Sequence, residues 1–209
     1  MLSASRRTAL VAAAIFAIAA IGSATAHADT WTIDPVHSSI DFSVRHMMLS
    51  NVTGEFDKFS GTITATGDDP NSVAIEVTID AASVDTHTER RDNDLRSPNF
   101  LDVAKYPTIT FKSTKVEAAG QNRWKVTGDL TLHGVTKPVV LDVTGPTPEV
   151  KAMGKIHRAA SATTTIDRQD FGLTFNKTLD NGGLVVGNEV TITINVDAAK
   201  NPLTDGVEK

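Results

Sequence analysis

The chain has 209 residues, with 20 Lys and Arg against 25 Asp and Glu, a formal net charge of −5 and no cysteine. Its length fits one domain, or at most two small ones. The absence of thiols excludes a disulfide scaffold, a zinc ribbon and a cysteine nucleophile. The acidic balance offers no electrostatic footprint for nucleic acid, and a hydrophobic content of 40% is too high for a disordered tail.

Residues 1–28 have the pattern of an export signal. Arg6 and Arg7 form a positive start, an apolar run follows over 8–21, and Ala26-His27-Ala28 gives a small-x-small cleavage pattern. The run is shorter than the about 20 apolar residues that a membrane span needs. We therefore expect a cleaved signal peptide and a periplasmic or secreted protein. The two arginines partly match a twin-arginine signal, but the pair alone favours the general secretory (Sec) route.

The remaining residues, 29–209, show the period-2 alternation of antiparallel strands with one dry and one wet face. His133-Gly134 has the composition of a two-residue hairpin turn. A slip of parity near Asp57-Lys58 indicates a bulge or a turn. The alternation is clearest over 40–44, 73–79, 124–132, 139–143 and 184–196, and weaker over 52–63, 108–116, 156–166 and 173–177.

Only one stretch looks helical, the polar segment 88–95, and a short turn follows at 97–100. About nine strands and one helical insert, with no internal repeat or linker, predict a single all-β domain over 29–209. A sandwich and a closed barrel both use such a pattern. The aliphatic dry faces and the aromatic content of 5% favour a barrel with room for a ligand, although composition alone leaves a solid core open.

No local motif for metal binding or nucleophilic catalysis is present. The histidines after the signal lack H-x-x-x-H spacing, and G-x-S-x-G and the glycine-rich phosphate loops are missing. We therefore predict no catalytic residue and no metal site. An enzyme that uses His46 or His37 with a neighbouring acid is kept as an alternative.

Two polar features could serve a ligand. His46 shares the parity of the apolar residues on its strand, so it is either a satisfied rim histidine or a polar group at the mouth of a cavity. Segment 89–96 carries three arginines. It is either an exposed turn in which Asp92 and Arg96 pair across one helical turn, or a site for an anionic head group.

Five segments, taken in chain order, resemble the YceI-like family of periplasmic polyisoprenoid-binding proteins. The match begins at Trp31 and covers essentially all of 31–197. Asp94 is a departure, because the family often has His there, which implies either a different head-group preference or a purely structural role. The matching segments are 31–46, 91–111, 128–137, 168–172 and 186–190.

The resemblance implies an antiparallel lipocalin-like barrel of about eight strands with an elongated apolar tunnel. It implies a bound isoprenoid lipid, such as a polyprenyl lipid or a quinone tail, and no settled catalytic activity and no other cofactor. Burial of each CH₂ group contributes about 0.8 kcal/mol, so an aliphatic tunnel can hold such a chain without specific polar contacts.

We expect the ligand-binding residues to be apolar side chains of dry-face parity, with His46 and Arg91 at the polar end. The expected partner is a lipid or other hydrophobic small molecule, with no nucleic acid and no membrane-spanning part. An accessory module of a membrane electron-transfer or stress-response system is the alternative, and it adds transient contact with membrane proteins. The candidate lining is Ile40, Phe42, Val44, Ile75, Val77, Phe111, Leu130, Leu132, Phe175, Ile192 and Ile194.

Overall fold

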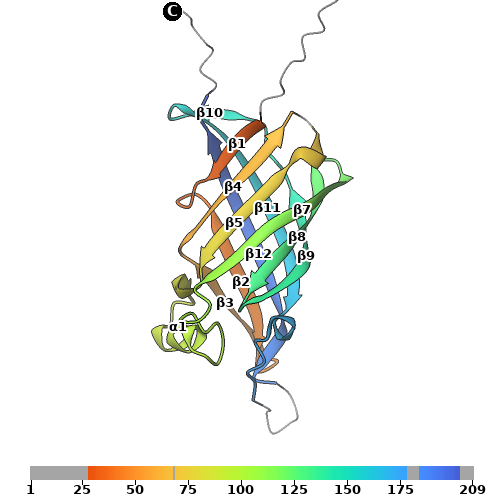
Figure 1. Cartoon of the computed structure of the whole chain (residues 1–209). Helices are drawn as coiled ribbons and strands as arrows, with labels where there is room; N and C mark the ends of the chain where they lie inside the picture. The colour runs from red at the N-terminus through yellow and green to blue at the C-terminus, as the bar shows by residue number, and fades with distance from the viewer. Residues whose placement is uncertain (1–27, 68, 178–183, 203–209) are drawn as a thin grey trace, which may run out of the picture.

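The computed structural model describes residues 28–67, 69–177 and 184–202. The strands wrap into a closed antiparallel barrel of eight strand positions, and the α-helix of the described chain lies at one end of it (Figure 1). The predicted all-β barrel is confirmed. The predicted signal peptide lies outside the described residues except for Ala28, which begins the first strand and pairs with Thr66.

The elements have the following bounds: β1 Ala28–Ile33, β2 Ser39–His46, β3 Ser50–Phe56, β4 Phe59–Thr66, η1 Pro70–Ser72, β5 Ala74–Asp80, η2 Ala81–Ser83, β6 Val84–Asp85, α1 Glu89–Arg96, β7 Thr108–Gly120, β8 Arg123–Leu132, β9 Val135–Thr144, β10 Val150–Ala152, β11 Lys155–Asp167, η3 Arg168–Phe171 and β12 Val186–Lys200.

Strand β12 closes the barrel. It pairs with β11 over twelve residues, while the sheet runs the other way from β11 through β9, β8, β7, β5, β4 and β1 back to β12. Residues 198–199 of β12 pair with β1, and residues 186–195 pair with β2. Strands β1 and β2 therefore occupy successive lengths of one barrel position.

The predicted irregularity at Asp57-Lys58 is a corner between β3 and β4. Strand β3 pairs with β2 and β6, whereas β4 pairs with β1 and β5. Ser83 holds the corner, since its carbonyl accepts from the Asp57 N–H at 3.1 Å and its hydroxyl accepts from the Lys58 N–H at 3.0 Å. The parity slip thus marks the point where one strand position is broken into two.

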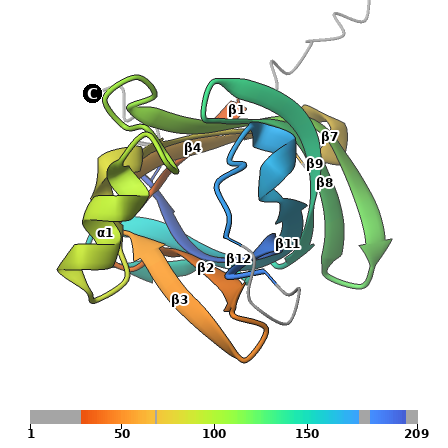
Figure 2. The ribbon, with the colours of Figure 1, turned by 90° about the horizontal axis from the view of Figure 1, so that it is seen from below.

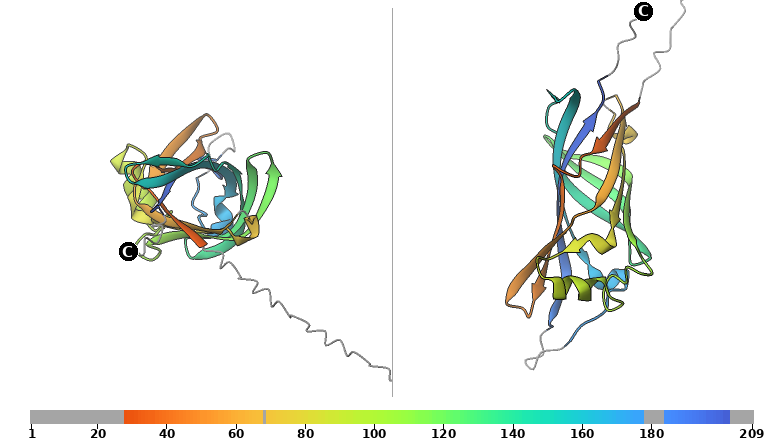
Figure 3. Two further views of the ribbon diagram at one scale, coloured as in Figure 1. Left: turned by 90° about the horizontal axis from the view of Figure 1, so that it is seen from above. Right: turned by 90° about the vertical axis from the view of Figure 1, so that its left-hand side faces the viewer.

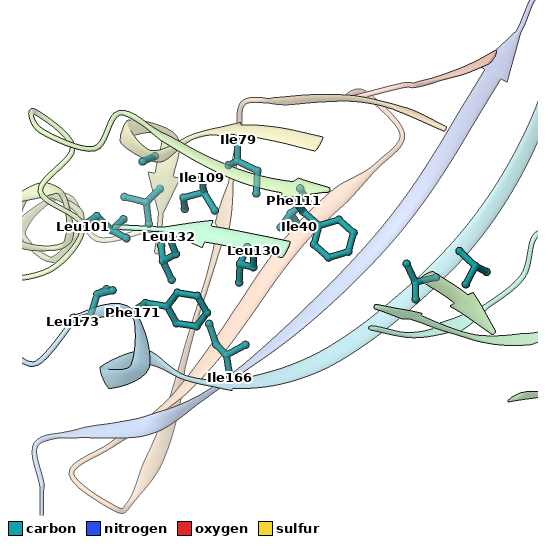
Figure 4. Close-up of a cluster of buried hydrophobic side chains, with 14 residues drawn as sticks. Ile40, Ile79, Leu101, Ile109, Phe111, Leu130, Leu132, Ile166, Phe171 and Leu173 are labelled. Carbon is teal, nitrogen blue, oxygen red and sulfur yellow. The ribbon is translucent and has the colours of Figure 1, made fainter. Parts of the chain in front are cut away.

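The local predictions are confirmed at two places and wrong at a third. His133-Gly134 joins β8 to β9 with φ of 52° and 75°, as a type I′ hairpin turn requires. The helical insert is α1, within one residue of the predicted ends. Segment 173–177, predicted as a weak strand, belongs to no strand. Its Leu173 instead packs into the core beside Phe171 of η3 (Figure 4).

Two clusters of buried apolar side chains lie inside the barrel. The larger one gathers strand residues such as Ile109 and Leu132 with residues from turns and short helices, among them Leu101 and Phe171 (Figure 4). The smaller one is Trp31 with Ile156 and Ala198. We call the end formed by α1, η3 and the turn at 97–107 the α1 end, and the opposite end the Trp31 end. Seen from below, α1 and η3 lie on opposite sides of the α1 end (Figure 2).

Candidate functional site

The inward faces of the strands enclose a cavity of about 270 Å³. Its lining comes from strands all around the barrel, together with Leu95 of α1 and the Phe100-Leu101 turn. Only Asp41, Ser161, Thr164 and Arg168 have polar side chains among the lining residues. Such a cavity favours a ligand that is itself apolar over most of its length. The volume lies near the lower end of the range for ligand pockets, about 300 Å³.

Ten of the thirteen predicted ligand-binding residues line this cavity. They meet across strands because period-2 parity sends them all inward: Phe42 opposes Ile192, and Phe111 opposes Leu130. The ten are Ile40, Phe42, Val44, Ile75, Val77, Phe111, Leu130, Leu132, Ile192 and Ile194.

The other three predicted residues, His46, Arg91 and Phe175, lie outside the cavity lining. His46 is half-buried at the end of β2, opposite Ser50. Phe175 packs its ring against Phe100, with the ring centroids 5.0 Å apart. Phe175 therefore packs against a lining residue but does not itself line the cavity.

Arg91 fastens a turn. Its guanidinium donates to the Thr86 hydroxyl at 2.6 Å and to the Thr86 carbonyl at 2.8 Å. The buried carboxylate of Asp92 accepts from the N–H and the hydroxyl of the same threonine, at 2.8 and 2.5 Å. Arg96 donates to the carbonyls of Ala82 and Val84. These bonds hold α1 against η2 and β6, which accounts for two of the three arginines of the segment as anchors of the helix.

Sequence reasoning missed a buried arginine in the cavity wall. Arg168, at the start of η3, is 4% exposed and lines the cavity. Its guanidinium donates to the carbonyls of Leu173 and Gly187, the latter at 2.9 Å. Burial lowers the pKa of this guanidinium below its ordinary value. The arginine joins η3, the 173–177 segment and β12, and no period-2 signal could identify it because it lies in a short helix.

The remaining missed lining residues fall into two groups. Val139, Leu141 and Val143 of β9 have the same inward parity as the predicted set and could have been included on that signal. Leu95, Phe100 and Leu101 line the cavity because the α1 segment folds over the barrel end, and strand parity carries no information about that packing.

A glycine makes room for one aromatic ring in the wall. Gly128 of β8 lies against the Phe111 ring, and a Cβ atom there would sit 2.3 Å from the Phe111 Cζ. Any side chain at 128 would push the ring toward the cavity. The alternation Val126, Gly128, Leu130 therefore includes the glycine for steric reasons.

The histidines kept as alternative catalytic groups are not assembled with the cavity. His37 is exposed in the turn before β2, and its Nδ1 lies 2.8 Å from the Asp34 carboxylate. This contact raises the pKa of His37 and lowers that of Asp34. In the part of the chain that the structure describes, no three His, Asp or Glu side chains gather as metal ligands. Within the same residues, no helix is long and apolar enough to cross a membrane.

Comparison with known proteins places the chain in a family. Residues 31–198 match the YceI-like domain, and the chain belongs to the YceI-like family. A UPF0312 protein of Vibrio cholerae is 37% identical over 169 residues, which cover 78% of this chain and 87% of the relative. A UPF0312 protein of Pectobacterium carotovorum is also 37% identical, covering 81% of this chain and 88% of its own.

Solved structures share the fold. The YCEI protein of Campylobacter jejuni is 32% identical, with a TM-score of 0.64 over 76% of this chain and 90% of its own. BcnA of Burkholderia cenocepacia superimposes with a TM-score of 0.68 at 24% identity, over 79% of this chain and 98% of its own. A polyisoprenoid binding domain from Saccharophagus degradans gives 0.59 at 19% identity, over 82% and 98%. The last two show the fold alone.

Proposed function

We propose that this protein is exported and binds a long-chain isoprenoid lipid, a polyprenyl lipid or a quinone tail, for carriage or sequestration. The observation that carries the proposal is the apolar cavity inside the barrel, lined by aliphatic and aromatic side chains from its strands. Hydrocarbon buried there gains about 0.8 kcal/mol for each CH₂ group without needing polar partners. The fold shared with a polyisoprenoid binding domain supports the same ligand class, and the pattern of residues 1–28 supports export.

The proposal is tested on protein purified from the periplasmic fraction of its own host. Native mass spectrometry before and after organic extraction should show a mass excess that extraction removes, together with a released isoprenoid lipid. If wild-type protein from this source has the same mass before and after extraction and releases no lipid, the proposal is wrong.

A matched pair of variants locates the ligand. Ile192→Trp fills the cavity from β12, whereas Thr191→Trp places the same side chain on the exposed face of that strand. Displacing two CH₂ groups costs about 1.6 kcal/mol, so Ile192→Trp should weaken the affinity for lipid by about tenfold and lower the amount that is retained through purification. Thr191→Trp should retain the wild-type amount. Equal retention by both variants would place the lipid outside the cavity.

A further inference from the structure

The β2–β3 hairpin ends in three consecutive apolar residues whose side chains lie in solvent. Met47, Met48 and Leu49 are 39, 57 and 77% exposed. They join His46 to Ser50, the last register pair of the hairpin, and we call them the Met47–Leu49 tip. Large apolar side chains gathered on a surface mark a site of interaction.

The backbone conformation of this tip is unfavourable for methionine. Met47 and Met48 have φ of 50° and 62°, in the left-handed region that glycine and asparagine adopt most easily. The turn is held by the Met47 N–H, which donates to the Val185 carbonyl at 2.8 Å, and by the Leu49 N–H, which donates to His46. Smaller or more polar residues would make the same turn at lower cost, so the fold alone does not explain the methionines.

The residues of the hairpin on either side of the tip include basic but no acidic side chains, in an acidic protein. Residues 42–54 contain no Asp or Glu, although the chain has 25. Behind the tip, the exposed Arg45 guanidinium donates to the Met48 carbonyl at 3.1 Å and to the Asn51 side chain at 3.2 Å. An apolar apex with a cation at its base matches the layering of a bilayer surface, where acyl chains lie beneath anionic phosphates.

The tip also continues the wall of the cavity. Phe42 and Val44 of β2 line the cavity, and so does Val186, which pairs with His46 at the base of the tip. The hairpin projects at the α1 end, away from the first and last described residues (Figures 1 and 3). The tip therefore follows directly on strands whose apolar side chains line the cavity.

We propose that the Met47–Leu49 tip inserts into the surface of an anionic lipid bilayer, and that the lipid ligand enters the barrel from there. The second half of this proposal rests on the proposed function. A protein partner is a poorer match, because a specific protein interface buries about 800 Å² on each side and three residues on a convex turn present far less.

The absence of cysteine permits a site-resolved test in the full chain. Leu49→Cys and, as a matched control, Met153→Cys are each labelled with an environment-sensitive bimane dye. Met153 is 96% exposed, has φ of 50° and lies on the β10–β11 hairpin at the Trp31 end, between Lys151 and Lys155. The control thus shares the exposure and the basic surroundings of position 49, and the left-handed backbone of Met47 and Met48.

Vesicles of phosphatidylcholine with phosphatidylglycerol should shift the emission of the dye at position 49 to the blue and leave the dye at 153 unchanged. Vesicles of phosphatidylcholine alone should reduce the shift because Arg45 then lacks anionic partners, and high salt should reduce it because the charges are screened. No shift at position 49, or an equal shift at 153, overturns the proposal.

A second measurement uses sedimentation with the same vesicles. The double variant Met48→Asp, Leu49→Asp should bind about tenfold more weakly than wild type, which corresponds to about 1.4 kcal/mol, and Met153→Asp should bind as wild type does. If the double variant sediments with vesicles as wild type does, the proposal that the tip inserts into the bilayer is wrong. The lipid extracted from wild-type protein separates the two proposals. If the protein binds vesicles but holds no lipid, the proposed function is wrong. If it holds lipid but does not bind vesicles, the proposed insertion of the tip into a bilayer is wrong.

Discussion

The two ends of the barrel are built differently. At the Trp31 end, a buried indole packs against Ile156 and Ala198, and the Lys200 ammonium lies 4.6 Å from its ring centroid. The same lysine pairs with Asp29 at 2.5 Å and with Glu149 at 3.5 Å. Strands β1, β11 and β12 meet there in continuous ladders. Aromatic packing, cation–π contacts and ion pairs thus close this end.

The α1 end has no such closure by strands. It is covered by an eight-residue helix, a 3₁₀ helix and turns, which are fastened by arginine bonds to backbone carbonyls. Short elements held by few ladder bonds open locally at lower free energy than paired strands do. The two ends therefore differ in what closes them, paired strands at the Trp31 end and short elements over a buried cluster at the α1 end. This difference supports the proposal that the ligand enters at the α1 end.

The largest effect on stability is expected at the Trp31 end. Trp31→Ala removes a side chain that is 6% exposed and should lower the free energy of unfolding by about 3–5 kcal/mol through lost burial and the cavity that remains. Urea denaturation of the variant and wild type measures the difference. A loss below about 1 kcal/mol would contradict the view that Trp31 is the main closure of this end.

The anchor of α1 should have a smaller effect. Asp92→Ala leaves the Thr86 N–H and hydroxyl without their buried acceptor, which should cost about 1–3 kcal/mol. Asp94→Ala, on the same helix but exposed, is the control and should change stability by less than about 0.5 kcal/mol. Equal losses in the two variants would show that the helix is not held through Asp92.

The same carboxylate makes the α1 end sensitive to acid. Burial acts to raise the pKa of Asp92, but the hydrogen bonds from Thr86 and the charge of Arg96 outweigh it, so the pKa is lowered from 3.8. The carboxylate therefore stabilises the fold above about pH 4, and this contribution is lost as the pH falls toward the folded-state pKa. Asp92→Asn should flatten the loss of stability measured between about pH 5 and pH 3. If the free energy of unfolding of Asp92→Asn depends on pH as that of wild type does, Asp92 is not the source of the acid sensitivity.

Ion pairing at the Trp31 end should contribute less than packing. Lys200→Met keeps most of the apolar stem over Trp31 but removes the pairs with Asp29 and Glu149. We expect a loss of about 0.2–1 kcal/mol, because the partners are partly exposed. Thermal unfolding at low and high salt measures this loss of stability, and the difference in stability between Lys200→Met and wild type should shrink in high salt. A difference that salt does not change would assign the effect to packing on Trp31.

The smallest effect on stability is expected at the Met47–Leu49 tip. Leu49→Ser removes an exposed side chain, so the free energy of unfolding should stay within about 0.5 kcal/mol of wild type. Vesicle binding by the same variant should nevertheless weaken. A large loss of stability would show that Leu49 serves the fold and is not free to contact a bilayer.

Much of the fold could be predicted from alternation alone. The inward parity of Phe42, Phe111 and Ile192 follows from the strand period, and the turn at His133-Gly134 follows from its composition. The position of His46 could not be predicted in this way, because a polar residue of inward parity can end either in a cavity or beyond its rim. Strand parity also says nothing of Arg91, which lies in α1. Arg91 is held by Thr86, five residues earlier in the chain, through a turn whose shape only the folded segment defines.

By itself, the sequence determined the all-β class, the antiparallel pairing, the short helix and ten residues of the cavity lining, because strand parity and turn composition are local properties. Only the tertiary structure decided that β1 and β2 share one position beside β12, and that Arg168, Leu101 and Leu173 complete the lining. It also decided which end Trp31 closes and where Met47–Leu49 lies. These depend on contacts between residues far apart in the chain, which no local period encodes.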